Sequence, residues 1–277
     1  MVFKLPATLL CDFYKVGHRE QYPDRTERVY ATWTPRSNKH HPSTDTVVAF
    51  GFQALIKEYL IDFFNENFFK RKLSDIIAEY ERVIKYCLFV EEPNSDHIKA
   101  LWGLGYLPIE IYALPEGTKV PMRVPMMTIE NTVDRFFWIT NYLESLLSTE
   151  LWMPITVSTI ACEYREILDK WCEKTGGDPE VVQFQGHDFA MRGMECLQGS
   201  VKSGMGHLLS FKGTDTIGAI LAHEYFYGAN IEKELVGCSI PATEQSVQSA
   251  GILSAEEDFE NKGEWNGYSL ESFRELF

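Results

Sequence analysis

Three short segments of this 277-residue sequence carry side chains that could act on a small molecule. They are Gly186–Gly193 (GHDFAMRG), Phe211–Thr216 (FKGTDT) and Ser239–Ser246 (SIPATEQS). Each segment follows a short apolar run and contains one acidic residue: Asp188, Asp215 and Glu244, respectively. A carboxylate in such a place can accept hydrogen bonds from a ligand, or it can cap the helix that follows.

The first segment combines an aromatic ring with cationic and polar groups. Phe189 could offer a flat surface for stacking, and Arg192 a planar fork of donors for phosphate or amide oxygens. His187 stands beside them. In the structural alternative, Asp188 caps the next helix and Phe189 packs in the core. The segment by itself leaves both interpretations open.

The second segment is equally ambiguous. Asp215 stands directly before an apolar-periodic stretch, so it could be a helix N-cap, worth about 1 kcal/mol, or could accept a hydrogen bond from a bound amide. Gly213 indicates either a special backbone angle or a close approach to a ligand. The glycines of Ser203–His207 (SGMGH) match neither a Walker A loop nor a strand-following GxGxxG, so they predict a tight turn.

The elements that must position these residues follow from apolar spacing. Helices are expected between 47 and 86, two short strands within 107–130, and helices at 134–151 and 156–173. Three strand–helix units then follow, with strands at 181–184, 207–211 and 238–240, helices at 191–201, 216–226 and 246–253, and a further helix at 270–276.

This order predicts an α/β protein. We expect an α+β N-terminal domain with a small sheet over residues 1–150. The first units of an irregular α/β barrel should follow over 151–277, incomplete at the C-terminus. Asp188, Asp215 and Glu244 would then lie at the C-terminal ends of strands, with their carboxylates converging on one cleft.

Composition excludes several classes of partner. A net charge of −14 argues against a surface for nucleic acid or an anionic membrane, and no apolar run approaches the roughly 20 residues of a membrane helix. The N-terminus does not resemble a signal peptide. Six cysteines without a CxxC pair predict reduced thiols and a cytoplasmic location, and no metal-ligand spacing is present.

In their order, the three segments resemble the active-site core of the nicotinamide phosphoribosyltransferases, a type II phosphoribosyltransferase family whose third motif reads PAxEHS. Here that motif is Pro241–Ser246, PATEQS. The resemblance extends through further motifs, namely Asp12–His18 (DFYKVGH), Phe50–Gln53 (FGFQ), Ile129–Thr132 (IENT) and Pro154–Val157 (PITV).

The resemblance implies a reaction of NAD salvage, in which nicotinamide and 5-phosphoribosyl-1-pyrophosphate give nicotinamide mononucleotide and pyrophosphate, with Mg²⁺ on the pyrophosphate. It implies that Tyr14 and Phe189 sandwich the pyridine ring, Tyr14 coming from the second subunit of a homodimer. Asp215 would recognise the carboxamide, which favours the amide over a carboxylate substrate. His187 would also bind substrate, and Arg36 and Arg192 would lie near the phosphate and pyrophosphate groups.

The third motif departs from the family. Glu244 corresponds to the acid that precedes the His phosphorylated by ATP, but the His itself is replaced by Gln245. The catalytic set implied is therefore Asp215, Glu244 and Gln245. The nitrogen lone pair of a primary amide is delocalised into the carbonyl, so we expect no coupling to ATP, which is a substrate in the family.

A non-catalytic alternative stays open. The chain ends soon after the third motif, whereas the family takes much of its phosphoribosyl site from later loops, so the resemblance implies truncation. Together with Gln245, this allows a truncated homologue that binds nicotinamide or a partner subunit.

Overall fold

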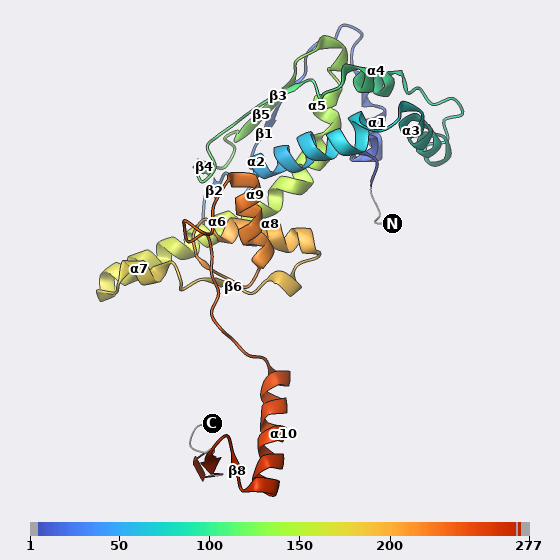
Figure 1. Cartoon of the computed structure of the whole chain (residues 1–277). Coiled ribbons are helices and arrows are strands. Elements are labelled where there is room, and N and C mark those ends of the chain that lie inside the picture. The colour runs from blue at the N-terminus through green and yellow to red at the C-terminus, as the bar shows by residue number, and fades with distance from the viewer. Residues whose placement is uncertain (1–4, 270, 273–277) are drawn as a thin grey trace. The chain divides into compact units, whose positions relative to one another are not determined.

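The computed structural model describes residues 5–269 and 271–272. The chain separates into two compact units, Met1–Cys238 and Ser239–Phe277 (Figure 1). Helices and strands alternate in the manner of an α/β protein, which confirms the predicted fold class. The domain boundary expected near residue 150 stays a prediction.

The first unit contains a three-stranded antiparallel sheet in the order β1-β5-β3. Its strands are β1 (Tyr30–Trp33), β5 (Met127–Asn131) and β3 (Ile109–Ala113). A separate antiparallel pair joins β2 (Thr46–Val48) to β4 (Lys119–Pro121). Two strands were expected within 107–130. The structure has three in that range, because the second predicted strand is divided into β4 and β5, which belong to different sheets.

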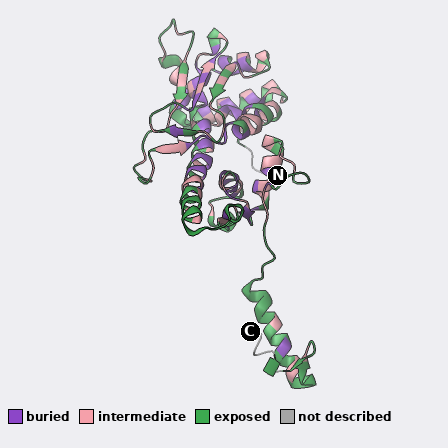
Figure 2. Ribbon diagram, turned by 90° about the vertical axis from the view of Figure 1, so that its left-hand side faces the viewer, coloured by how far each residue is buried: buried purple, intermediate pink, exposed green. Residues whose placement is uncertain are grey.

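Helices of the N-terminal portion enclose the main core. They are η1 (Ala7–Leu9), α1 (Phe13–Val16), η2 (His18–Gln21), α2 (Phe52–Leu55), the π-helical η3 (Ile56–Phe63) and η4 (Asn65–Phe69), α3 (Leu73–Cys87) and α4 (Asp96–Leu104). Phe68, Ile76 and Tyr80 are fully buried between them. Figure 2 shows the distribution of buried residues along the ribbon. Apolar spacing thus predicted the helices between 47 and 86 correctly, apart from the short strand β2.

The two separate helices predicted at 134–151 and 156–173 were wrong in their boundaries. After η5 (Asp134–Phe136) and α5 (Ile139–Tyr142), one long helix, α6 (Glu144–Thr175), runs through Pro154 without a break. Leu151 and Ile155 are buried on either side of this proline. Packing on both sides therefore holds the helix together where proline would favour a kink.

Proline and glycine meet where α2 begins. Gly51 has φ +94°, and a Cβ there would lie 2.8 Å from Cγ of Pro154. Position 51 therefore requires glycine for two reasons: the positive φ angle and the close approach of α6.

Strand–helix units follow α6, although their strands are shorter than predicted and begin later in the sequence. The segment contains α7 (Pro179–Val182), β6 (His187–Asp188), η6 (Met191–Gly193), α8 (Leu197–His207), β7 (Gly213–Thr214) and α9 (Ile217–Tyr227). β6 and β7 are parallel, and Gly213 also forms a parallel bridge to Cys238.

The strands expected at 181–184 and 207–211 were wrong. Asp178 accepts a hydrogen bond from the Glu180 amide, and Pro179 occupies the first turn, so the first of these segments begins a helix. The tight turn expected at Ser203–His207 lies inside α8. Its glycines serve packing, because a Cβ at Gly204 would lie 2.6 Å from Cβ of Ala219 in α9.

The second unit consists of α10 (Gln245–Lys262) and a hairpin of β8 (Glu264–Trp265) and β9 (Tyr268–Ser269). Asn266 and Gly267 form its turn with positive φ angles, as Asn-Gly hairpin turns require. Residue 270 and residues 273–277 of the expected C-terminal helix lie outside the described residues. Within the described part of the chain, no helix is long and apolar enough to span a membrane.

Candidate functional site

Two of the predicted segments meet at the ends of neighbouring strands, but their carboxylates do not converge on one cleft as expected. Asp188 bonds to Thr214 on the buried face of the strand pair, and Asp215 pairs with His187 on the exposed face. Asp188 ends β6, and Asp215 directly follows β7. The amide of Asp215 donates to the carbonyl oxygen of Asp188 at 2.9 Å. Parallel pairing thus brings the first two candidate segments to one edge of the strand pair, although only Asp215 of the two carboxylates faces solvent there.

His187 and Asp215 form the polar centre of this cluster. Nε2 of His187 lies 2.8 Å from Oδ1 of Asp215, and the Asp215 side chain is 43% exposed. Helix α9 begins at Ile217 with Thr216 at its cap position and no side-chain cap bond. Asp215 is therefore no N-cap, and its carboxylate faces the imidazole where a ligand could reach it.

The cluster has an accessible aromatic face. Phe189 is 66% exposed, and its ring stacks on His187 with centroids 4.3 Å apart and planes at 27°. The core position that the sequence left open for Phe189 is therefore wrong. One side of the ring contacts the imidazole, and stacking on the remaining surface is the arrangement that a flat heteroaromatic ligand prefers.

Gly213 shapes the floor beneath the imidazole. A Cβ at this position would lie 2.7 Å from Nδ1 of His187. His207 supports the same strand, because its Nε2 lies 2.9 Å from the Gly213 carbonyl oxygen, and burial lowers the pKa of His207. The close approach that Gly213 permits is thus to a neighbouring side chain of the site.

Asp188 has a structural role. Its side chain is buried, and it accepts hydrogen bonds from the Ala190 amide at 2.8 Å and from the Thr214 hydroxyl at 3.2 Å. Thr214 in turn accepts a bond from the Thr216 amide at 3.0 Å. Sequence reasoning missed Thr214; its position between Gly213 and Asp215 was the available signal.

Arg192 lies on η6 with an exposed side chain, close in sequence to Phe189. Within the described residues, no group of three or more His, Cys, Asp or Glu side chains could hold a metal ion. The cluster that the described contacts define therefore consists of one aromatic face and one carboxylate–imidazole pair.

Tyr14 and Arg36 lie elsewhere in the first unit. Tyr14, on α1, is 59% exposed, and its ring contacts His18 edge-on at 5.1 Å. Arg36 lines a cleft of about 690 Å³ beside β1 and α6. Among the described contacts none joins Tyr14 to Phe189, and Figure 1 draws α1 and β6 in different regions of the first unit.

Glu244 and Gln245 belong to the second unit. Glu244 precedes α10 and accepts a hydrogen bond from the Ser246 hydroxyl, and Gln245 is the first residue of that helix. Both side chains are exposed. Their convergence with Asp215 stays a prediction.

Comparison with known proteins gives a consistent picture. Residues 7–111 match a family model described as the N-terminal domain of nicotinamide phosphoribosyltransferase. The nicotinamide phosphoribosyltransferase of Acinetobacter baylyi is 46% identical over 255 residues, which are 91% of this chain and 50% of that protein. The protein of the same name from Xanthomonas campestris is 34% identical, over 85% of this chain and 47% of that protein.

The chain spans about half the length of the curated relatives it matches. Among solved structures, human nicotinic acid phosphoribosyltransferase aligns with a TM-score of 0.60 and 16% identity, over 87% of this chain and 40% of that one. At this low identity, the similarity to the solved structure shows a shared fold alone.

Proposed function

Because this chain belongs to the nicotinamide phosphoribosyltransferase family, we propose that it takes part in forming nicotinamide mononucleotide and pyrophosphate from nicotinamide and 5-phosphoribosyl-1-pyrophosphate. The observation that carries the proposal is the cluster of Phe189, His187 and Asp215. An exposed ring beside a solvent-accessible carboxylate suits a planar heteroaromatic amide.

Each group has a physical task in this reaction. Phe189 stacks on the pyridine ring, and Asp215 accepts a hydrogen bond from the carboxamide NH₂, which orients the ring nitrogen toward the ribose carbon. As the bond from the ribose carbon to pyrophosphate breaks, positive charge develops on the ribose and negative charge on the leaving pyrophosphate. Arg192 donates to the phosphate oxygens and stabilises that negative charge. Positioning and charge stabilisation supply most of the catalysis.

Mg²⁺ enters as the complex with 5-phosphoribosyl-1-pyrophosphate. The described residues hold no cluster of metal ligands, and Mg²⁺ commonly binds through substrate phosphates with only one or two carboxylates. Its role is to neutralise the pyrophosphate, and the residues of this chain hold the nucleophile.

We further propose that the site is shared between two copies of the chain. Tyr14 is exposed, and the buried Lys15 beside it donates to Asn141 Oδ1 at 2.6 Å and pairs with Glu144, so α1 is anchored to α5 and α6. A fixed and exposed aromatic ring of this kind suits the second face of the pyridine ring, with Arg36 of the same copy near the phosphates.

Nicotinamide binding tests the site directly. Isothermal titration should give an affinity that falls at least tenfold in Asp215→Ala, because a hydrogen bond to a charged group contributes about 1.5–3 kcal/mol. Phe189→Ala should weaken binding several-fold. Glu232→Ala, which removes an exposed carboxylate outside the cluster, is the matched control.

Equal affinity of Asp215→Ala and the control would refute the role of Asp215. Product formation is then assayed on the same proteins. Nicotinamide binding without nicotinamide mononucleotide formation would identify the chain as a ligand-binding homologue. For the shared site, a mixture of Tyr14→Ala and Phe189→Ala chains should be more active than either variant alone, because a mixed dimer contains one site with both rings intact.

The glutamine at position 245 decides whether ATP can phosphorylate the protein there. A neutral imidazole can accept a phosphoryl group, but an amide nitrogen cannot, although the amide forms hydrogen bonds of similar reach. We predict no acid-labile phosphate on the protein after incubation with labelled ATP, and label in Gln245→His. Label on the unaltered chain would contradict this assignment.

A further inference from the structure

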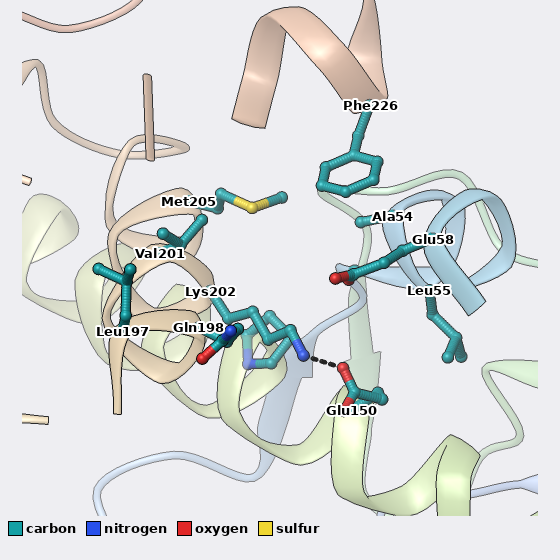
Figure 3. A pocket seen from close by; sticks show the side chains of 12 residues that line it. Ala54, Leu55, Glu58, Glu150, Leu197, Gln198, Val201, Lys202, Met205 and Phe226 are labelled. Atoms are coloured by element: carbon teal, nitrogen blue, oxygen red, sulfur yellow. Dashed lines mark hydrogen bonds and ion pairs between the residues drawn. The ribbon is translucent and has the colours of Figure 1, made fainter. Parts of the chain in front are cut away.

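A second pocket lies apart from the candidate site, where helices of the N-terminal portion meet α8 and α9. It encloses about 240 Å³, and neither His187, Phe189 nor Asp215 lines it. Figure 3 shows side chains from α2, η3, α6, α8 and α9 surrounding this space. All of them belong to the first unit.

Carbon atoms form most of the pocket wall. Met205 of α8 is 2% exposed, and Leu55 of α2 is equally buried. Phe226 contributes a ring from the end of α9. Pro154 of α6 also lines the pocket. A wall of this kind favours an apolar body, because apolar surface removed from water contributes about 25 cal/mol per Å².

One end of the pocket is charged. Lys202 of α8 forms an ion pair with Glu150 of α6, and their side chains are only 20% and 11% exposed. Nζ of Lys202 also lies 5.4 Å from the centroid of the Tyr59 ring. The charge of this lysine is therefore already balanced, which is the condition under which a half-buried ammonium is tolerated.

Glu58 is the remaining charged group. Its carboxylate extends from η3 toward the interior of the pocket (Figure 3). In the described part of the chain, no hydrogen bond or ion pair reaches it. Burial raises the pKa of Glu58, and the nearby charge of Lys202 opposes that rise. The pocket thus contains two carboxylates and one ammonium group.

We propose that this pocket binds a small organic cation, an ammonium group carried on an aryl or short alkyl body. The ammonium pairs with Glu58, and the apolar body lies against Leu55, Met205 and Phe226. An anion would meet two carboxylates and a lysine that Glu150 already neutralises. A neutral ligand would add no charge to the pocket, and Glu58 would then interact only with Lys202, which Glu150 already pairs.

The test uses the phenethylammonium ion and the full 277-residue chain. Titration calorimetry should give an affinity at least tenfold higher for this cation than for neutral 2-phenylethanol or anionic 3-phenylpropanoate. In Glu58→Gln, which keeps the size of the side chain, that preference should fall at least tenfold. Glu66→Gln, which removes an exposed carboxylate of η4 outside the pocket, is the matched control.

The position of the ligand is read independently of any pocket variant. With methyl-labelled methionine, the cation should shift the resonance of Met205, assigned with Met205→Leu. Equal binding of the cation and the alcohol, an unchanged preference in Glu58→Gln, or an unshifted Met205 resonance would overturn the proposal. Competition by nicotinamide would assign the cation to the candidate site, and would also overturn it.

Discussion

At the scale of single residues, two aspartates at adjacent strand ends have opposite surroundings. Asp188 is 8% exposed and holds the loop after β6 through the Ala190 amide and the Thr214 hydroxyl. The side chain of Asp215 is 43% exposed and pairs with His187. Removing the first carboxylate leaves buried donors without an acceptor, whereas removing the second alters a surface that a ligand can reach.

His97 makes stability depend on pH. It is buried between Tyr80, whose hydroxyl lies 3.4 Å from Nε2, and the edge of Trp138. Burial lowers its pKa to about 4, with Arg19 adding to the effect and Asp96 opposing it. The unfolded chain takes up this proton below about pH 6.5, whereas the folded chain does so only near pH 4.

Unfolding free energy should therefore fall as pH drops from 6.5 toward 4, by about 2 kcal/mol from this residue between pH 7.5 and 5.0. Urea denaturation at the two pH values measures it. In His97→Gln the protein loses some packing at both pH values, but the difference between them should shrink by about 2 kcal/mol. An unchanged difference would exclude His97 as the source.

At the scale of elements, the meeting of α2 with α6 depends on Gly51. We expect Gly51→Ala to lower the unfolding free energy by about 3 kcal/mol, from strain at positive φ and from the clash with Pro154. Gly117→Ala is a matched control, because Gly117 has φ +89° with no atom within 4 Å of an added Cβ. It should lose only the strain, about 1–2 kcal/mol. Equal losses in urea denaturation would show that the contact with Pro154 contributes nothing.

Apolar spacing predicted some elements well and others poorly, for local physical reasons. Helix α9 and strands β3 and β5 agree with their patterns, because each buries one consistent face or alternates along its length. The continuity of α6 through Pro154 could not be predicted, since it depends on the burial of Leu151 and Ile155 by elements distant in the sequence. Val182 is buried in a helical turn, and an apolar run of that length does not distinguish strand from helix.

The sequence predicted which two segments meet at the strand ends, but not how their side chains are arranged. The segments around Asp188 and Asp215 were identified from residue type and their position after apolar runs, and parallel strands bring them together. Their different roles follow from burial, which depends on Thr214 and Gly204 packing around one carboxylate. No spacing in the sequence contains that information.

At the scale of the whole molecule, α9 presents an uncovered apolar face. Ile217, Leu221 and Tyr225 lie four residues apart and are 69%, 51% and 67% exposed, whereas Ala219 and Ala222 on the opposite side are buried. A helix that is apolar on both sides is typical of one covered on both sides.

Such a face favours association between copies, because burying it removes apolar surface from water. We predict species larger than a dimer that increase with concentration in sedimentation velocity. Leu221→Glu should reduce them while changing the unfolding free energy by no more than about 0.5 kcal/mol, since the side chain already faces solvent. Leu209→Glu makes the same charge change at an exposed leucine that follows α8, and should leave association unaltered. If both variants reduce association equally, added charge is the cause; if neither does, α9 is not the surface through which the copies meet.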